Sequence, residues 1–127
     1  MCLAGASGAG AELLKSVPQS ELRAYFVWVP MLPGDSAEAA AGAAARFAEG
    51  RARHYWDGER ALSRRLAERV RMGVEYAWDV YLAYGRAQAD LARPAFWMHQ
   101  LPGVKVAPRL DVGEWRRRVE GLLRQST

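Results

Sequence analysis

Cysteine and histidine are scarce in this chain of 127 residues, which has one cysteine and two histidines. The single cysteine, Cys2, excludes a disulfide within the chain and a zinc site built from several cysteines. His54 and His99 are too few for a metal site unless carboxylates converge on them, and we expect both to pack or hydrogen-bond inside strands. We therefore expect neither a metal nor a cofactor.

Long apolar runs are also missing. No uninterrupted apolar segment approaches the roughly 20 residues that a membrane-spanning helix needs, and the start of the chain lacks the basic and apolar regions of a signal peptide. Half of the residues are nonetheless hydrophobic, which excludes a wholly disordered chain. We expect a single domain over residues 1–127, in a cytoplasmic protein without a membrane partner.

Lysine is nearly missing as well, so the net charge of +4 comes mainly from arginine. The arginines share their predicted helices with acidic residues, as Arg64 does with Glu59 and Arg116 with Glu120. Helices of mixed charge usually present a solvated face, and the chain has no basic stripe with interleaved aromatic residues. A nucleic-acid-associated domain is therefore only the third alternative for its function.

Four segments have the composition of β-strands. Apolar residues follow one another without interruption from Ala24, which is typical of a strand buried on both faces of a parallel sheet. Pro94 begins the last segment, where proline costs least, and we expect this segment to pair antiparallel with the one before it. The predicted strands cover residues 24–29, 51–56, 77–84 and 94–101.

Capping signals place helices around these strands. A short helix over residues 11–15 precedes the first strand, and Asp35, Asp57 and Asp111 are predicted to cap the three later helices. Gly73 is predicted to end the helix that Asp57 begins, by taking a left-handed conformation. Helices that alternate with strands predict an α/β protein, with a mixed sheet covered on both sides. The five tryptophans are expected in its core.

Four phrases of the sequence resemble the thioredoxin-like family of the thiol-disulfide interchange kind: VWVPMLPGDS (27–36), HYWD (54–57), AWDVYL (77–82) and PAFWMHQL (94–101). The resemblance implies a thioredoxin-like mixed sheet flanked by helices, with Cys2 in the place of the second cysteine of Cys-x-x-Cys. The first cysteine of that motif and the strand before it have no counterpart in this sequence, which begins at Met1. That strand would be central, between the predicted strands 24–29 and 77–84, so its loss would leave an unpaired edge on each of them. We expect Met1 to be internal to a longer reading frame that supplies both the cysteine and the strand. If the short chain is real, a domain swap, a homo-oligomer or a rearranged sheet must compensate.

The resemblance also implies where a redox site would lie. Cys2 would stand at a helix N-terminus, where the helix dipole favours the thiolate. Asp79, inside a predicted strand, either faces a polar patch or is the buried acid that such proteins often keep behind their cysteines. Tyr76 belongs to the segment that faces the cysteines, where this chain lacks the family's usual proline. Phe96 and Trp97 are candidates for lining an apolar peptide-binding surface.

Two functions follow from the resemblance. The first is that of a thiol-disulfide oxidoreductase relative with an incomplete Cys-x-x-Cys site and little independent redox activity. It would act as an enzyme only with a second cysteine supplied from elsewhere, because one thiol can form a mixed disulfide but cannot resolve it. The second is that of a non-catalytic module that binds or supports another protein. The expected partner is accordingly a protein or a disulfide substrate.

Overall fold

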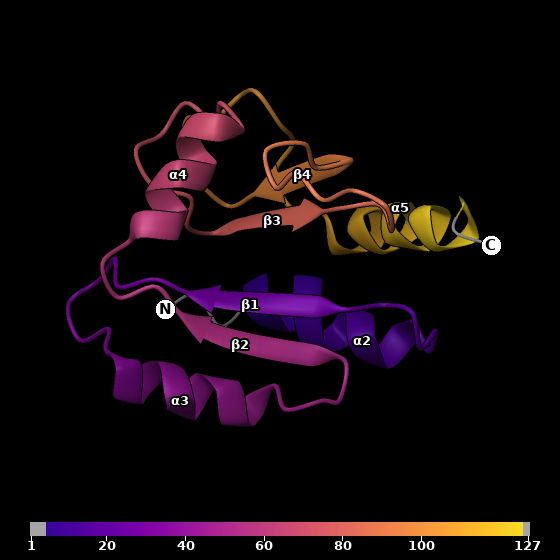
Figure 1. The fold of residues 1–127 in the computed structure, drawn as a ribbon, viewed down its shortest axis with the longest axis horizontal. Helices are drawn as coiled ribbons and strands as arrows, with labels where there is room; N and C mark the ends of the chain where they lie inside the picture. The colour runs from indigo at the N-terminus through magenta and orange to yellow at the C-terminus, as the bar shows by residue number, and fades with distance from the viewer. Residues whose placement is uncertain (1–4, 126–127) are drawn as a thin grey trace.

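The computed structural model describes residues 5–125, in which helices and strands alternate along the chain (Figure 1). This confirms the expectation of an α/β protein. No helix in the described range is both long and apolar enough to cross a bilayer. The elements are a π-helix η1 (Ala6–Ala11), α2 (Glu12–Ser16), β1 (Ala24–Trp28), α3 (Ala37–Arg46), β2 (Ala52–Trp56), α4 (Ala61–Arg69), β3 (Val80–Ala83), β4 (Phe96–His99) and α5 (Val112–Gln125).

The strands form two separate pairs, and not the single mixed sheet that the sequence predicts. β1 pairs in parallel with β2, so that Phe26 lies opposite His54. β3 pairs antiparallel with β4, so that Tyr81 lies opposite Met98. In Figure 1, β1 lies between β2 and β3, yet no ladder joins β1 to β3 in the described part of the chain. Both strands contact η1 or its N-cap residue: Phe26 of β1 lies against Gly10, and Tyr81 of β3 lies against Gly5.

Local hydrogen bonds correct the predicted cap of α3. The hydroxyl of Ser36 accepts a hydrogen bond from the backbone N–H of Ala39 at 3.0 Å, so Ser36 is the N-cap. Asp35 serves the preceding loop, because its carboxylate accepts from the backbone N–H groups of Met31 and Leu32 at 3.1 and 2.9 Å. Aspartate and serine can both cap a helix. Ser36 is the cap here because the Asp35 carboxylate is bonded to the loop amides.

The third predicted strand begins later than its sequence suggests. Asp79 has a left-handed backbone with φ of 52°, and the strand starts at Val80. The residues before it are held by α4: the N–H of Ala77 donates to the carbonyl of Ser63 at 3.0 Å, and the Ser63 hydroxyl donates to the carbonyl of Ala77 at 2.8 Å. Residues 77–79 therefore pack as a loop, and Asp79 does not lie inside a strand.

α4 begins at Ala61, with Arg60 and not the predicted Asp57 as its N-cap, and it ends earlier than predicted. The Asp57 carboxylate accepts from the N–H of Ser63 at 2.8 Å in the first turn. The helix ends at Arg69, and Arg71 already has a left-handed φ of 61°. Gly73 is left-handed too, at φ 81°, but it lies in the loop beyond the helix. The glycine therefore turns this loop and does not end the helix.

The two strand pairs are covered to different extents. The β3–β4 pair has η1, α2 and α5 on one face, in a core that includes Leu13, Phe96, Met98 and Trp115. α4 covers its other face, where Val80, Leu82 and Trp97 pack. α3 covers one face of the β1–β2 pair through Trp28, Ala40 and Ala43. The opposite face carries Tyr25 and Tyr55, which are 64% and 52% exposed.

η1 joins the two halves because its glycines allow close approach. A Cβ on Gly5 would collide with the hydroxyl of Tyr81 in β3, and a Cβ on Gly10 would collide with the ring of Phe26 in β1. α5 is tied to the same helix, because Nε1 of Trp115 donates to the carbonyl of Ala9 at 2.9 Å. Glycine inside a helix costs about 1 kcal/mol relative to alanine, which these contacts offset.

Candidate functional site

The residues predicted to form a site do not come together in the described part of the chain. Cys2 lies outside the described residues. Phe96 is buried in the core beside Trp115, with the guanidinium of Arg118 above its ring at 4.2 Å. Trp97 points to the opposite face of β4, toward α4. Consecutive residues of a strand alternate between its faces, so Phe96 and Trp97 lie on different faces of β4.

Tyr76 is held by arginines of α4 and its N-terminal flank. The guanidinium of Arg60 lies 4.6 Å from the centre of its ring, and that of Arg64 lies 5.2 Å from it. Arg64 also donates to the Tyr76 hydroxyl at 2.6 Å, a contact that raises the pKa of the guanidinium. Glu75 is 3.7 Å from Arg64. This cluster fixes the loop after α4 on the surface and brings no second reactive group to Tyr76.

Asp79 sits at the beginning of β3, where its carbonyl accepts from the N–H of Gln100 at 2.8 Å. The residue is half-buried. Its left-handed backbone marks the change from loop to strand. Whether its carboxylate serves chemistry at Cys2 stays a prediction.

Both histidines lie in strands and are hydrogen-bonded within the fold, as the sequence analysis expects. Nδ1 of His99 accepts from the N–H of Leu101 at 3.1 Å, so Nε2 carries the hydrogen and donates to the carbonyl of Ala107 at 2.9 Å. His54 repeats the pattern: Nδ1 accepts from Nε1 of Trp28 at 3.1 Å. Within residues 5–125, no three histidine, cysteine or acidic side chains gather to hold a metal ion.

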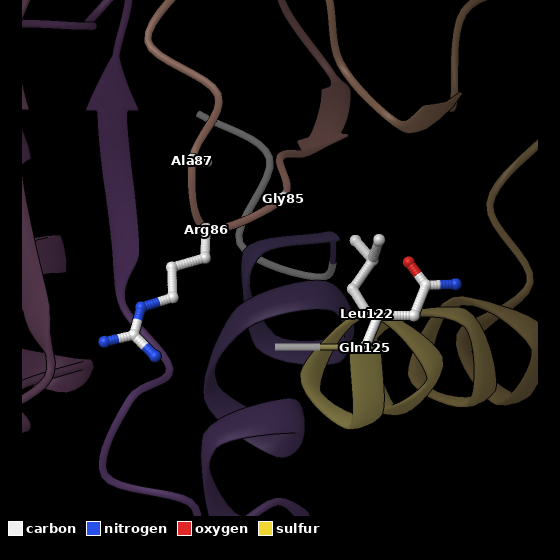
Figure 2. A pocket seen from close by; sticks show the side chains of 5 residues that line it. All are labelled: Gly85, Arg86, Ala87, Leu122 and Gln125. Atoms are coloured by element: carbon white, nitrogen blue, oxygen red, sulfur yellow. The ribbon is translucent and has the colours of Figure 1, made fainter. Parts of the chain in front are cut away.

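An open hollow of about 560 Å³ lies between the turn after β3 and the end of α5 (Figure 2). Arg86 is the one ionisable side chain among the residues that line it, which are Gly85, Arg86, Ala87, Leu122 and Gln125. In Figure 2 the Arg86 side chain points away from Leu122 and Gln125, toward the strand that has the colour of β1. The lining offers a cation to a ligand but no nucleophile and no base.

The edge of β1 that faces away from β2 has unused backbone groups. The N–H of Ala24 and the carbonyl of Trp28 bond toward β2, and backbone groups alternate in direction along a strand. The N–H and C=O groups of Tyr25 and Val27 therefore point to the other side. They have no hydrogen-bond partner within residues 5–125. Val27 is half-buried, so its backbone groups are partly shielded from water.

β3 has the same kind of edge. The carbonyls of Asp79 and Ala83 accept from the β4 side, at 2.8 and 2.7 Å, so the backbone groups of Val80 and Leu82 point away from β4. They too find no partner in the described range. Both residues are half-buried. Because buried or half-buried backbone groups are nearly always paired in native proteins, these two edges can accept a strand from another chain.

Comparison of the chain with family models, with curated proteins and with solved structures gives no match. The candidate site therefore stands on its own geometry. Sequence reasoning expected unpaired edges at these two strands but missed Arg86 beside them, because nothing in the loop 85–93 distinguishes one exposed arginine from another.

Proposed function

We propose that the chain is a thioredoxin-like domain that binds another protein and does not carry out disulfide exchange by itself. The observation that supports this is the pair of strand edges, on β1 and β3, whose backbone groups have no partner in residues 5–125. Strand edges of this kind bind extended segments of other chains through main-chain hydrogen bonds. The thioredoxin-like part of the proposal rests on the resemblance of the sequence and agrees with a parallel β1–α3–β2 unit followed by an antiparallel pair and a helix.

A binding test uses the full chain, immobilised, to select displayed peptides. Each enriched peptide is then titrated into the chain in solution, with the intrinsic fluorescence of the tryptophans as the signal. We expect extended peptides with dissociation constants in the micromolar to millimolar range, on the order of −4 to −8 kcal/mol. Enrichment without any binding in solution would contradict a protein-binding function.

A redox test separates the second function. Reduction of insulin by dithiothreitol is followed by turbidity with the wild-type chain, with Cys2→Ser and with buffer. We expect no difference between the three, because a lone thiol cannot resolve its mixed disulfide. Faster precipitation by the wild-type chain than by Cys2→Ser would show that Cys2 is redox-active, and a catalytic function would then replace the proposed one.

A further inference from the structure

We propose that one extended segment of a partner protein, about five residues long, lies between β1 and β3 and pairs with both edges at once, with an acidic residue at its end nearest Arg86. This inference rests on the proposed function and specifies its partner. The chemistry that recognises the segment is a double main-chain ladder, apolar side chains on both faces and one charge at the rim.

The contacts of η1 are compatible with a single strand between the two edges. The same helix touches Phe26 of β1 at Gly10 and Tyr81 of β3 at Gly5. A helix is about 10–12 Å across. Two strands separated by exactly one intervening strand are about 9.6 Å apart, twice the spacing of neighbours in a sheet. One helix can therefore rest on both strands when a single strand lies between them.

The directions of the strands define how the segment pairs. Figure 1 shows β1 and β3 running in opposite directions. A segment between them is therefore parallel to one and antiparallel to the other, whichever way it runs. Because successive N–H groups of a strand point to opposite sides, alternate residues of the segment bond to β1, through Tyr25 and Val27, and the others bond to β3, through Val80 and Leu82.

The side chains on either face select an apolar segment. Phe26 and Tyr81 flank the face that η1 covers. Val27, Val80 and Leu82 flank the opposite face, and all three are half-buried. A strand with apolar neighbours on both faces is typically built from valine, isoleucine and leucine without alternation with polar residues. The partner segment is accordingly expected to be rich in these residues.

Charge distinguishes the two ends of the segment. Because β1 and β3 run in opposite directions, the end of β3 and the start of β1 lie at the same end of the two edges. Arg86 follows β3, is exposed, and forms no ion pair with the described residues. Arg23 precedes β1 and donates to the carbonyls of Ser20 and Leu22. Two arginines at this end favour a carboxylate on the partner.

The test uses two soluble peptides, EVIVVTK and KVIVVTE, blocked at both ends, which place the acidic residue at either end of the segment. Each is titrated into the full chain while amide hydrogen exchange is measured for Val27 and Leu82. We expect the peptide whose glutamate meets Arg86 to bind about threefold to tenfold more tightly, and the exchange of both amides to slow at least tenfold at saturation. Arg86→Glu should reverse the preference. Arg65→Glu, an equal charge change on an exposed face of α4, should leave it unchanged.

N-methylation of the peptide shows whether both edges are used. Methyl groups on the second and fourth amides remove the hydrogen bonds to one edge, and methyl groups on the third and fifth remove those to the other. Both methylated forms should bind at least tenfold more weakly. Weakening by only one form would mean that the partner pairs with a single edge, which overturns this inference while the binding function stands. Peptides that bind without slowing exchange at the amides of Val27 or Leu82 would also overturn this inference while the binding function stands.

Two further outcomes would overturn this inference. If the wild-type chain sediments as a dimer whose Val27 and Leu82 amides are already protected, a second copy occupies the edges and the inference is wrong. If neither these peptides nor the selected ones bind in solution, the inference and the proposed function fall together.

Discussion

The β1–β2 half of the molecule stacks its aromatic rings, whereas the β3–β4 half packs them edge to face. Phe26 lies nearly parallel to Phe47, at 4° and 5.7 Å between ring centres, and to His54 at 18° and 4.7 Å. In the other half, Trp115 meets Phe96 at 72° and Tyr81 at 70°. Edge-to-face rings interlock from several directions, which suits a core enclosed by helices on both faces. A stack suits a sheet covered on only one face.

This difference indicates where the stability of the fold lies. The β3–β4 half buries its residues between η1, α5 and α4, while the β1–β2 half leaves Tyr25 and Tyr55 in solvent. The β1–β2 half therefore depends more on its connections to the rest of the chain than on its own core. Substitutions that remove buried groups in the β3–β4 half should lower the free energy of unfolding most. Substitutions at the connections between the halves should lower it less.

The two histidines allow a direct comparison of the halves. Each accepts a hydrogen bond at Nδ1 and has a backbone carbonyl as the partner of Nε2, but the two differ in burial. His99 is 0% exposed, and His54 is only half-buried. We expect His99→Ala to lower the free energy of unfolding by about 3 kcal/mol, because it leaves a cavity and two unpaired backbone groups. His54→Ala should cost about 1 kcal/mol. Urea unfolding followed by tryptophan fluorescence measures both, and His99→Gln serves if His99→Ala does not fold. Equal losses would show that burial does not distinguish the halves.

Arg51 is the main polar connection between β2 and α2. Its guanidinium donates to the carbonyls of Leu14, Val17 and Gln19, at 2.5, 2.6 and 3.0 Å, and pairs with Glu49 at 2.7 Å. Of these carbonyls, that of Leu14 lies in the last turn of α2, where the helix leaves carbonyls unpaired, and that of Val17 belongs to the C-cap residue.

We expect Arg51→Ala to lower the free energy of unfolding by about 2 kcal/mol. Arg53→Ala, two residues further along and exposed in β2, should change it by less than about 0.5 kcal/mol. Urea unfolding at matched salt is the measurement. A loss at position 53 as large as that at position 51 would mean that arginine stabilises β2 through general charge and not through these carbonyls.

Substitution of a glycine in η1 tests the contact between η1 and β1, and we expect a smaller loss of stability than for Arg51→Ala. Gly10→Ala brings a methyl group against the ring of Phe26, and overpacking of this kind costs about 1–2 kcal/mol. Gly42→Ala in α3 meets no atom within 4 Å, so it should raise stability by up to about 1 kcal/mol through helix propensity. The two midpoints of thermal unfolding should move in opposite directions. A rise for both would show that η1 does not pack closely on β1.

The alternation of helices and strands could be predicted because each element carries its own periodicity and caps. The division into two strand pairs could not, since pairing between strands depends on residues far apart in the sequence. The early start predicted for β3 failed for a similar reason: Ala77 is apolar like a strand residue, but Ser63 of α4 holds it through two hydrogen bonds. Contacts between distant residues decide both cases.

The candidate site was predicted less well, for two different reasons. Phe96 and Trp97 lie on opposite faces of β4, as neighbours in a strand do, and their part in binding stays a prediction. Asp79 could not be judged from its sequence, because its left-handed backbone follows from the loop before it. The two unpaired edges were expected, but only because the family resemblance indicated which strands would carry them.

The smallest expected effect concerns the loop between β3 and β4 and depends on pH. The hydroxyl of Tyr84 donates to the carbonyl of Leu91 at 2.6 Å, and partial burial, with the nearby Asp90, raises its pKa to about 12. The usual pKa of tyrosine is about 10. The folded state thus holds this proton more tightly, so the stabilisation is complete below pH 10 and is lost as the pH rises from about 10 to 12. Thermal unfolding of the wild type and Tyr84→Phe should therefore differ most near pH 8 and converge toward pH 12. Tyr25→Phe, which changes an exposed ring, provides the matched control. A constant difference between the wild type and Tyr84→Phe across this range would place the alkaline sensitivity elsewhere than in the β3–β4 half.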